Sequence, residues 1–96
     1  MLLIFYLLIV FKMIKYVKMK NQKKSINKKI FKKFGKILRQ KRREKNLTQE
    51  ELADLAGIHR TYVAGIEGGY RNPSLRNIYR LSKALKIKIR ELFDGV

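Results

Sequence analysis

Apolar residues form an unbroken run over positions 1–11, and from about residue 28 they recur at intervals of three and four. The second pattern is the spacing of one face of an α-helix. It predicts helices over residues 28–45, 48–55, 59–67, 74–85 and 88–94. No stretch shows the alternation typical of a strand, so the sequence predicts an all-α fold.

The apolar positions of these segments are expected to face a common core. They are Ile30, Phe34, Ile37, Leu38, Leu52, Ala53, Ala56, Val63, Ile66, Leu75, Ile78, Tyr79, Leu81, Ala84 and Leu85. The last segment adds Ile89, Leu92 and Phe93, more apolar surface than the thin core of a small monomer needs. We therefore expect these three residues to form a dimer interface, with closure of the monomer core as the alternative.

Local signals mark where the second and third helices begin and end. Thr48 followed by Glu51 has the spacing of a capping box, which starts a helix. Gly57 can adopt the left-handed conformation that ends one. Two short helices joined at this glycine, with the small residues Ala53 and Ala56 beside it, indicate a helix-turn-helix. In that arrangement the second helix lies in the major groove of DNA.

Charge and composition narrow the class of partner. The 96 residues carry a net charge of +17, and residues 21–46 hold twelve Lys or Arg against one acid. Such a balance favours a nucleic acid or an anionic membrane surface. There is no cysteine and one histidine, and no paired carboxylates, Ser-His-Asp set or glycine-rich phosphate loop is evident. We therefore expect no enzyme activity, no metal and no cofactor.

Residues 1–27 form an apolar, then basic, extension before a domain expected over 28–96. Its apolar run is shorter than the roughly 20 residues of a spanning helix. It also lacks the basic start and small-residue cleavage site of a signal peptide. Three interpretations remain: a dispensable segment with translation starting at Met19, an element that associates with a membrane through residues 1–20, or a helix that packs on the domain or on a partner.

A family resemblance sharpens the helix-turn-helix prediction. The stretch Leu47–Ile66, LTQEELADLAGIHRTYVAGI, resembles the phage-repressor/Cro-type (Xre-like) helix-turn-helix family, and the similarity continues through Glu67 and Arg71–Leu75. Arg60–Val63, followed by Gly65–Glu67, also resembles the small controller proteins of restriction–modification systems. The resemblance implies a compact five-helix lambda-repressor-like domain that binds a two-fold symmetric operator as a homodimer in the cytoplasm, at the nucleoid.

The resemblance also implies which residues read bases. Arg60 and Thr61, at the start of the third predicted helix, would point into the groove, where Arg reads guanine and the Thr methyl contacts thymine. Tyr62 would touch a phosphate or a base near the operator centre, or else pack against a neighbouring helix. Gly65 occupies a place where relatives often carry a longer reading side chain, so base readout there is expected to be narrower.

Other residues are expected to bind phosphate. Gln49 lies at the start of the second predicted helix, where free amides favour an anion. Arg71 and Asn72 follow the reading helix and are placed to clamp the backbone or reach toward the groove, and Arg76 is a further candidate. His59 either approaches a phosphate or caps the third helix. Such contacts fix the register on DNA and carry little sequence information.

One more pair has a structural role by resemblance. Arg42 in the first helix and Glu67 at the end of the third are expected to form a partly buried ion pair that pins the reading helix to the scaffold.

These observations predict a sequence-specific transcriptional regulator. A restriction–modification operon is one set of genes that it would control, and RNA polymerase is a further expected partner. Two alternatives remain open. One is an antitoxin-like binding module that regulates its own expression. The other is a membrane-tethered basic protein that uses residues 1–20 as an anchor.

Overall fold

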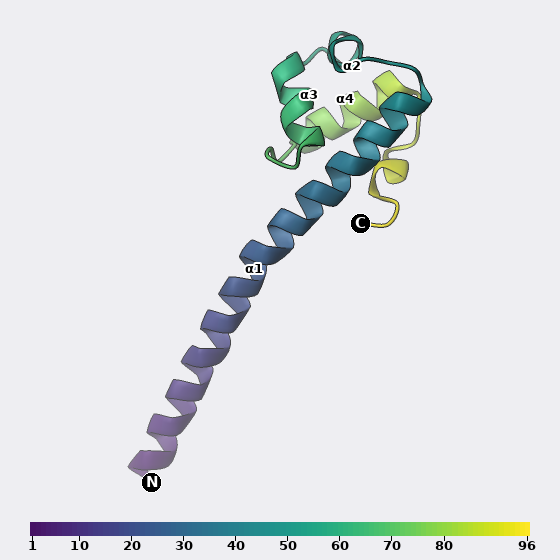
Figure 1. The fold of residues 1–96 in the computed structure, drawn as a ribbon. Coiled ribbons are helices and arrows are strands. Elements are labelled where there is room, and N and C mark those ends of the chain that lie inside the picture. The colour runs from purple at the N-terminus through teal and green to yellow at the C-terminus, as the bar shows by residue number, and fades with distance from the viewer.

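The computed structural model describes the backbone of residues 1–96 and the side chains of residues 1–23 and 27–96. Within these residues it contains four α-helices and one 3-10 helix (Figure 1). They are α1 (Leu2–Glu44), α2 (Gln49–Ala56), α3 (Arg60–Glu67), α4 (Leu75–Leu85) and η1 (Ile89–Phe93). The all-α prediction is confirmed.

Helix α1 is far longer than the sequence pattern predicts, because it begins at Leu2 and not near residue 28. The sequence before Gly35 contains no glycine or proline, so nothing interrupts the helix. Its N-terminal part projects from the domain as a straight rod, and the molecule extends over 67 Å (Figure 1). The side chains of residues 1–23 are exposed except for a half-buried Val10. The interpretation that residues 1–20 pack on the domain is therefore wrong.

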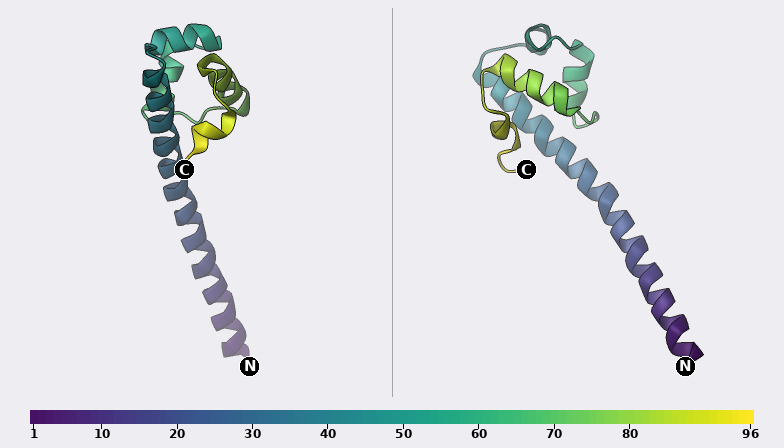
Figure 2. Two further views of the ribbon diagram at one scale, coloured as in Figure 1. Left: turned by 90° about the vertical axis from the view of Figure 1, so that its right-hand side faces the viewer. Right: turned by 180° about the vertical axis from the view of Figure 1, so that it is seen from behind.

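The remaining elements pack around one core at the C-terminal end of α1, with α2 and α3 on one side and α4 and η1 on the other (Figure 2). Its buried apolar residues are Phe34, Leu38, Leu52, Ala53, Ala56, Val63, Ile66, Ile78, Leu81, Leu85 and Leu92. Leu75 and Tyr79 were expected to face inward, but they are 76% and 54% exposed. Both lie at the edge of the apolar stripe of α4, where the neighbouring helices do not reach.

The predicted capping box at the start of α2 is confirmed. The Thr48 hydroxyl accepts a hydrogen bond from the Glu51 amide at 3.1 Å, and the Glu51 carboxylate accepts one from the Thr48 amide at 3.0 Å. The Thr48 amide lowers the pKa of Glu51, and the hydroxyl adds to this effect. Gly57 ends the helix with φ 69°, and the Ile58 amide donates to the Ala53 carbonyl at 3.0 Å. This turn sets the direction in which α3 leaves α2.

The fifth predicted helix is the short 3-10 helix η1. Leu92 is fully buried in the core of the same chain, so its assignment to a dimer interface is wrong. Ile89 and Phe93 remain 37% and 41% exposed, and the centroids of the Phe93 and Phe34 rings lie 5.3 Å apart. Only these two of the three expected interface residues are available to a second copy.

Within the described residues, no helix is both long enough and apolar enough to cross a membrane.

Candidate nucleic-acid interface

One side of helix α3 is buried in the core, and the opposite side is exposed. Val63 and Ile66 are buried against α1 and α2, while Arg60 and Thr61 at its first turn are exposed. The first helical residues of α3 are therefore free to contact a large partner. This is the placement that reading a DNA groove requires.

His59 caps α3. Its Nδ1 accepts a hydrogen bond from the Thr61 amide at 3.2 Å and lies 2.7 Å from the Thr61 hydroxyl. Of the two roles expected for His59, capping of α3 is therefore the one seen in the structure. His59 also fixes the position of Thr61, because it contacts both the backbone and the side chain of that residue.

The Arg71 side chain occupies the space that Gly65 leaves open on α3. A Cβ atom at Gly65 would lie 2.5 Å from Cγ of Arg71. The Arg71 guanidinium continues over the Tyr62 ring, 5.7 Å from its centroid, which is within the range of a cation–π contact. An arginine from the following loop thus adds a cation to the exposed side of α3.

Tyr62 is shared between the core and the surface. Its side chain is half-buried and packs against the core, and its hydroxyl lies 3.5 Å from the Asn72 carbonyl. In this structure Tyr62 therefore packs against a neighbouring part of the protein, which was the expected alternative to a DNA contact. The side chain of Asn72 and that of Arg76 in α4 are exposed.

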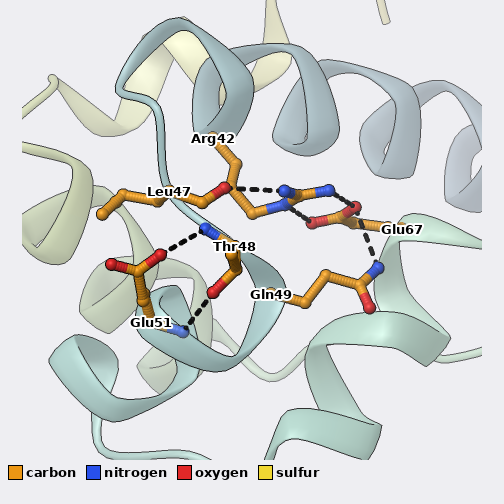
Figure 3. Close-up of polar contacts among 6 residues, drawn as sticks. All are labelled: Arg42, Leu47, Thr48, Gln49, Glu51 and Glu67. Atoms are coloured by element: carbon orange, nitrogen blue, oxygen red, sulfur yellow. Dashed lines mark hydrogen bonds and ion pairs between the residues drawn. The ribbon is translucent and has the colours of Figure 1, made fainter.

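Arg42 and Glu67 form a two-fold hydrogen-bonded ion pair, with Nε to Oε2 at 2.7 Å and Nη2 to Oε1 at 2.9 Å (Figure 3). Their side chains are only 10% and 3% exposed. Nη1 of Arg42 also donates to the Leu47 carbonyl at 2.7 Å. The hydrogen bonds to Glu67 raise the pKa of Arg42, outweighing the burial that lowers it.

Gln49 joins the same cluster. Its Nε2 donates to Oε1 of Glu67 at 3.2 Å, and the side chain is half-buried (Figure 3). The amide expected to meet a DNA phosphate thus already has a partner within the protein. Through Arg42, Leu47, Gln49 and Glu67 the cluster connects α1, the loop after it, α2 and the end of α3. We call these four residues the Glu67 cluster.

Gly35 is a positioning residue that the sequence reasoning missed. A Cβ atom there would lie 2.6 Å from the carbonyl oxygen of Glu67 and closer still to that of Ile66. The backbone of α1 therefore touches the last turn of α3 directly. The available signal was an isolated glycine inside a helical pattern, where it costs stability relative to alanine and therefore suggests a packing reason.

The chain matches known helix-turn-helix proteins over the region just described. Residues 38–92 match the helix-turn-helix family profile. Control protein C.BamHI of Bacillus amyloliquefaciens is 48% identical over 62 residues, which cover 64% of this chain and 76% of the relative. Control protein C.MunI of a Mycoplasma species is 42% identical over 64 residues, covering 66% and 86%.

A solved structure shares the fold. The restriction–modification controller protein C.AhdI from Aeromonas hydrophila is 54% identical, with a TM-score of 0.65, over 66% of this chain and 96% of that protein. The exposed first turn of α3, the rigid turn before it and the Glu67 cluster all lie within the matched region. The chain therefore belongs to the helix-turn-helix family of DNA-binding transcriptional regulators.

Proposed function

We propose that the chain is a controller-type transcriptional regulator that binds a palindromic operator as a homodimer. Each protomer places α3 in one major groove, with half-sites about one helical turn, roughly 34 Å, apart. The observation that carries the proposal is the exposed first turn of α3 on a rigid frame. The similarity to named control proteins supports restriction–modification genes as the regulated genes. The proposal assigns no catalytic step to the chain.

In this proposal Arg60 and Thr61 read base edges. Arg71, from the loop after α3, packs against Gly65 and Tyr62 of α3 and supplies either a phosphate contact or a further contact in the groove. Asn72, Arg76 and the ring of His59 are exposed and able to meet phosphates. Tyr62 and Gln49 contribute mainly through the protein contacts described above, which hold α3 and the start of α2 in place.

Arg60→Ala should weaken binding to the cognate operator by about 10- to 100-fold, because one bidentate guanine contact contributes about 1–3 kcal/mol. Binding to unrelated duplex DNA should change much less. The measurement is a salt-matched titration of both duplexes, with the operator taken from a footprint on the promoter of the chain's own gene.

Arg90→Ala is the matched control, since Arg90 is also exposed but lies on η1, away from α3. It should leave the ratio of specific to non-specific affinity unchanged. If Arg60→Ala reduced both affinities equally, Arg60 would be a phosphate contact and the base-reading assignment would fail.

Ile89→Glu should dissociate the proposed homodimer, raising the dimer dissociation constant about 100-fold or more, because it places a charge in an apolar contact. Ile89 is 37% exposed, so the folded protomer should tolerate the change. Sedimentation across a concentration series measures the effect. Leu55→Glu, at a 62% exposed position on α2, is the control and should leave the dimer intact. An Ile89→Glu protein that dimerised normally would move the interface elsewhere.

A further inference from the structure

The N-terminal part of α1, residues 2–19, is an extended apolar surface without a partner, and we call it the apolar arm. Leu2, Phe11 and Tyr16, spread along it, are 88%, 77% and 65% exposed. The arm stands clear of the DNA-binding domain in every view (Figures 1 and 2). Continuous exposed apolar surfaces of this extent mark sites of interaction with a partner or a membrane.

The distribution of apolar residues around the helix distinguishes between these partners. Residues 2–11 are apolar on all sides of the helix, with the Tyr6 hydroxyl as the one polar side-chain group. A partner protein typically covers a single stripe of a helix and would leave the other sides of this segment in water. Acyl chains surround an inserted helix and can cover all of them.

The next turns of the arm have two different faces. Lys12, Lys15 and Lys18 recur every three residues and lie on one side of the helix, while Met13 and Val17 lie on the other. Lysines opposite an apolar face are typical of a helix that lies in a membrane interface. Their long stems can follow the apolar surface while the ammonium groups reach the headgroups.

Charge argues against a second copy of the chain as the partner. Residues 12–36 contain eleven lysines, and the first acidic residue of the chain is Glu44. Two arms side by side would bring these like charges together. The apolar repeat is also interrupted by the polar residues at positions 20–23, which leaves too few heptads for a stable coiled coil. The same lysines are complementary to an anionic bilayer.

We propose that the apolar arm docks on an anionic phospholipid bilayer. Residues 2–11 insert among the acyl chains without spanning the bilayer, and Lys12, Lys15 and Lys18 lie at the headgroups. The domain from about residue 29 onward stays outside the bilayer. This inference does not depend on the proposed operator, because it uses only residues outside the matched region.

The full chain should co-sediment with vesicles of equal parts phosphatidylglycerol and phosphatidylethanolamine, and much less with phosphatidylcholine vesicles. Leu3→Glu/Leu7→Glu should lower the vesicle partition coefficient at least about tenfold, since two buried leucines are lost. Replacing Lys12, Lys15 and Lys18 by Gln should lower it about 100-fold on the anionic vesicles. Leu55→Glu is the matched control and should have no effect.

Two results would overturn the proposal. One is vesicle binding that survives Leu3→Glu/Leu7→Glu and disappears when duplex DNA is added, which would reflect charge on the domain alone. The other is absence of vesicle binding together with self-association in solution that the same double variant abolishes. A sample without vesicles, sedimented in parallel, separates aggregation from binding.

A fluorescence measurement reports insertion directly. The chain contains no tryptophan, so Phe11→Trp introduces a single tryptophan in the arm, whose emission is separable from that of the tyrosines. Its emission should shift to shorter wavelength when the anionic vesicles are added. Tyr70→Trp, at an 89% exposed position of the domain, should show no shift. Equal emission shifts at both positions, or none at position 11, would contradict docking through the arm.

Discussion

Glu67→Ala should lower the free energy of unfolding by about 3–5 kcal/mol, the usual effect of removing one partner of a buried ion pair. The Arg42 guanidinium would stay buried with two of its hydrogen bonds unmade, and the Gln49 amide would lose its acceptor. Chemical denaturation gives the energy directly. Because Glu67 faces the scaffold and not the groove, the ranking of operator sequences should persist in the protein that remains folded.

Glu44→Ala is the matched control for that experiment. Glu44 also pairs with a cation of α1, Lys41, but at 3.8 Å and with its side chain 51% exposed. Exposed pairs of this kind contribute about 0–1 kcal/mol, so the variant should be nearly as stable as the parent. If both variants lost comparable amounts of unfolding free energy, burial would not be the reason that the Glu67 cluster stabilises the protein.

Gly35→Ala should destabilise the protein by about 2 kcal/mol or more, even though alanine favours a helix over glycine by about 1 kcal/mol. The added methyl group would meet the carbonyl oxygens of Ile66 and Glu67, which belong to the backbone and cannot move aside by a rotamer change. Helix α3 would have to shift away from α1. Affinity for DNA should therefore fall together with stability.

The sign of the effect makes this test decisive. At an interior helical position without the contact, Gly→Ala would stabilise the protein. Lys36→Ala, at the next and exposed position of α1, should change stability by less than about 0.5 kcal/mol. A Gly35→Ala protein more stable than the parent would show that α1 and α3 do not touch as described.

The domain was largely predictable from sequence because its helices carry local signals. The capping box at Thr48 and the glycine at position 57 fix both ends of α2 through contacts within a few residues. The start of α1 was missed because the predicted boundary rested on a change in apolar pattern. A helix that packs against no other part of the protein can continue through such a change when its sequence contains no helix-breaking residue.

The parts of the site that sequence did not reveal depend on distant residues. An empty position at Gly65 suggested reduced readout, but the space is filled by Arg71 from the next loop. The role of Leu92 depended on whether η1 turns toward α1 or away from it, and the apolar pattern is the same in both cases. Phosphate binding by Gln49 followed from its place at a helix start, whereas its side chain is directed by Glu67.

The unbroken course of α1 has a mechanical consequence. At 1.5 Å per residue, the stretch from Leu2 to about residue 28 holds its two ends roughly 40 Å apart. A flexible linker would let the domain swing, whereas this strut fixes the direction of the apolar arm relative to the domain. With residues 2–19 docked on a bilayer, the helical segment up to residue 28 would hold the domain within roughly 14 Å of the membrane surface, with its orientation set by the helix.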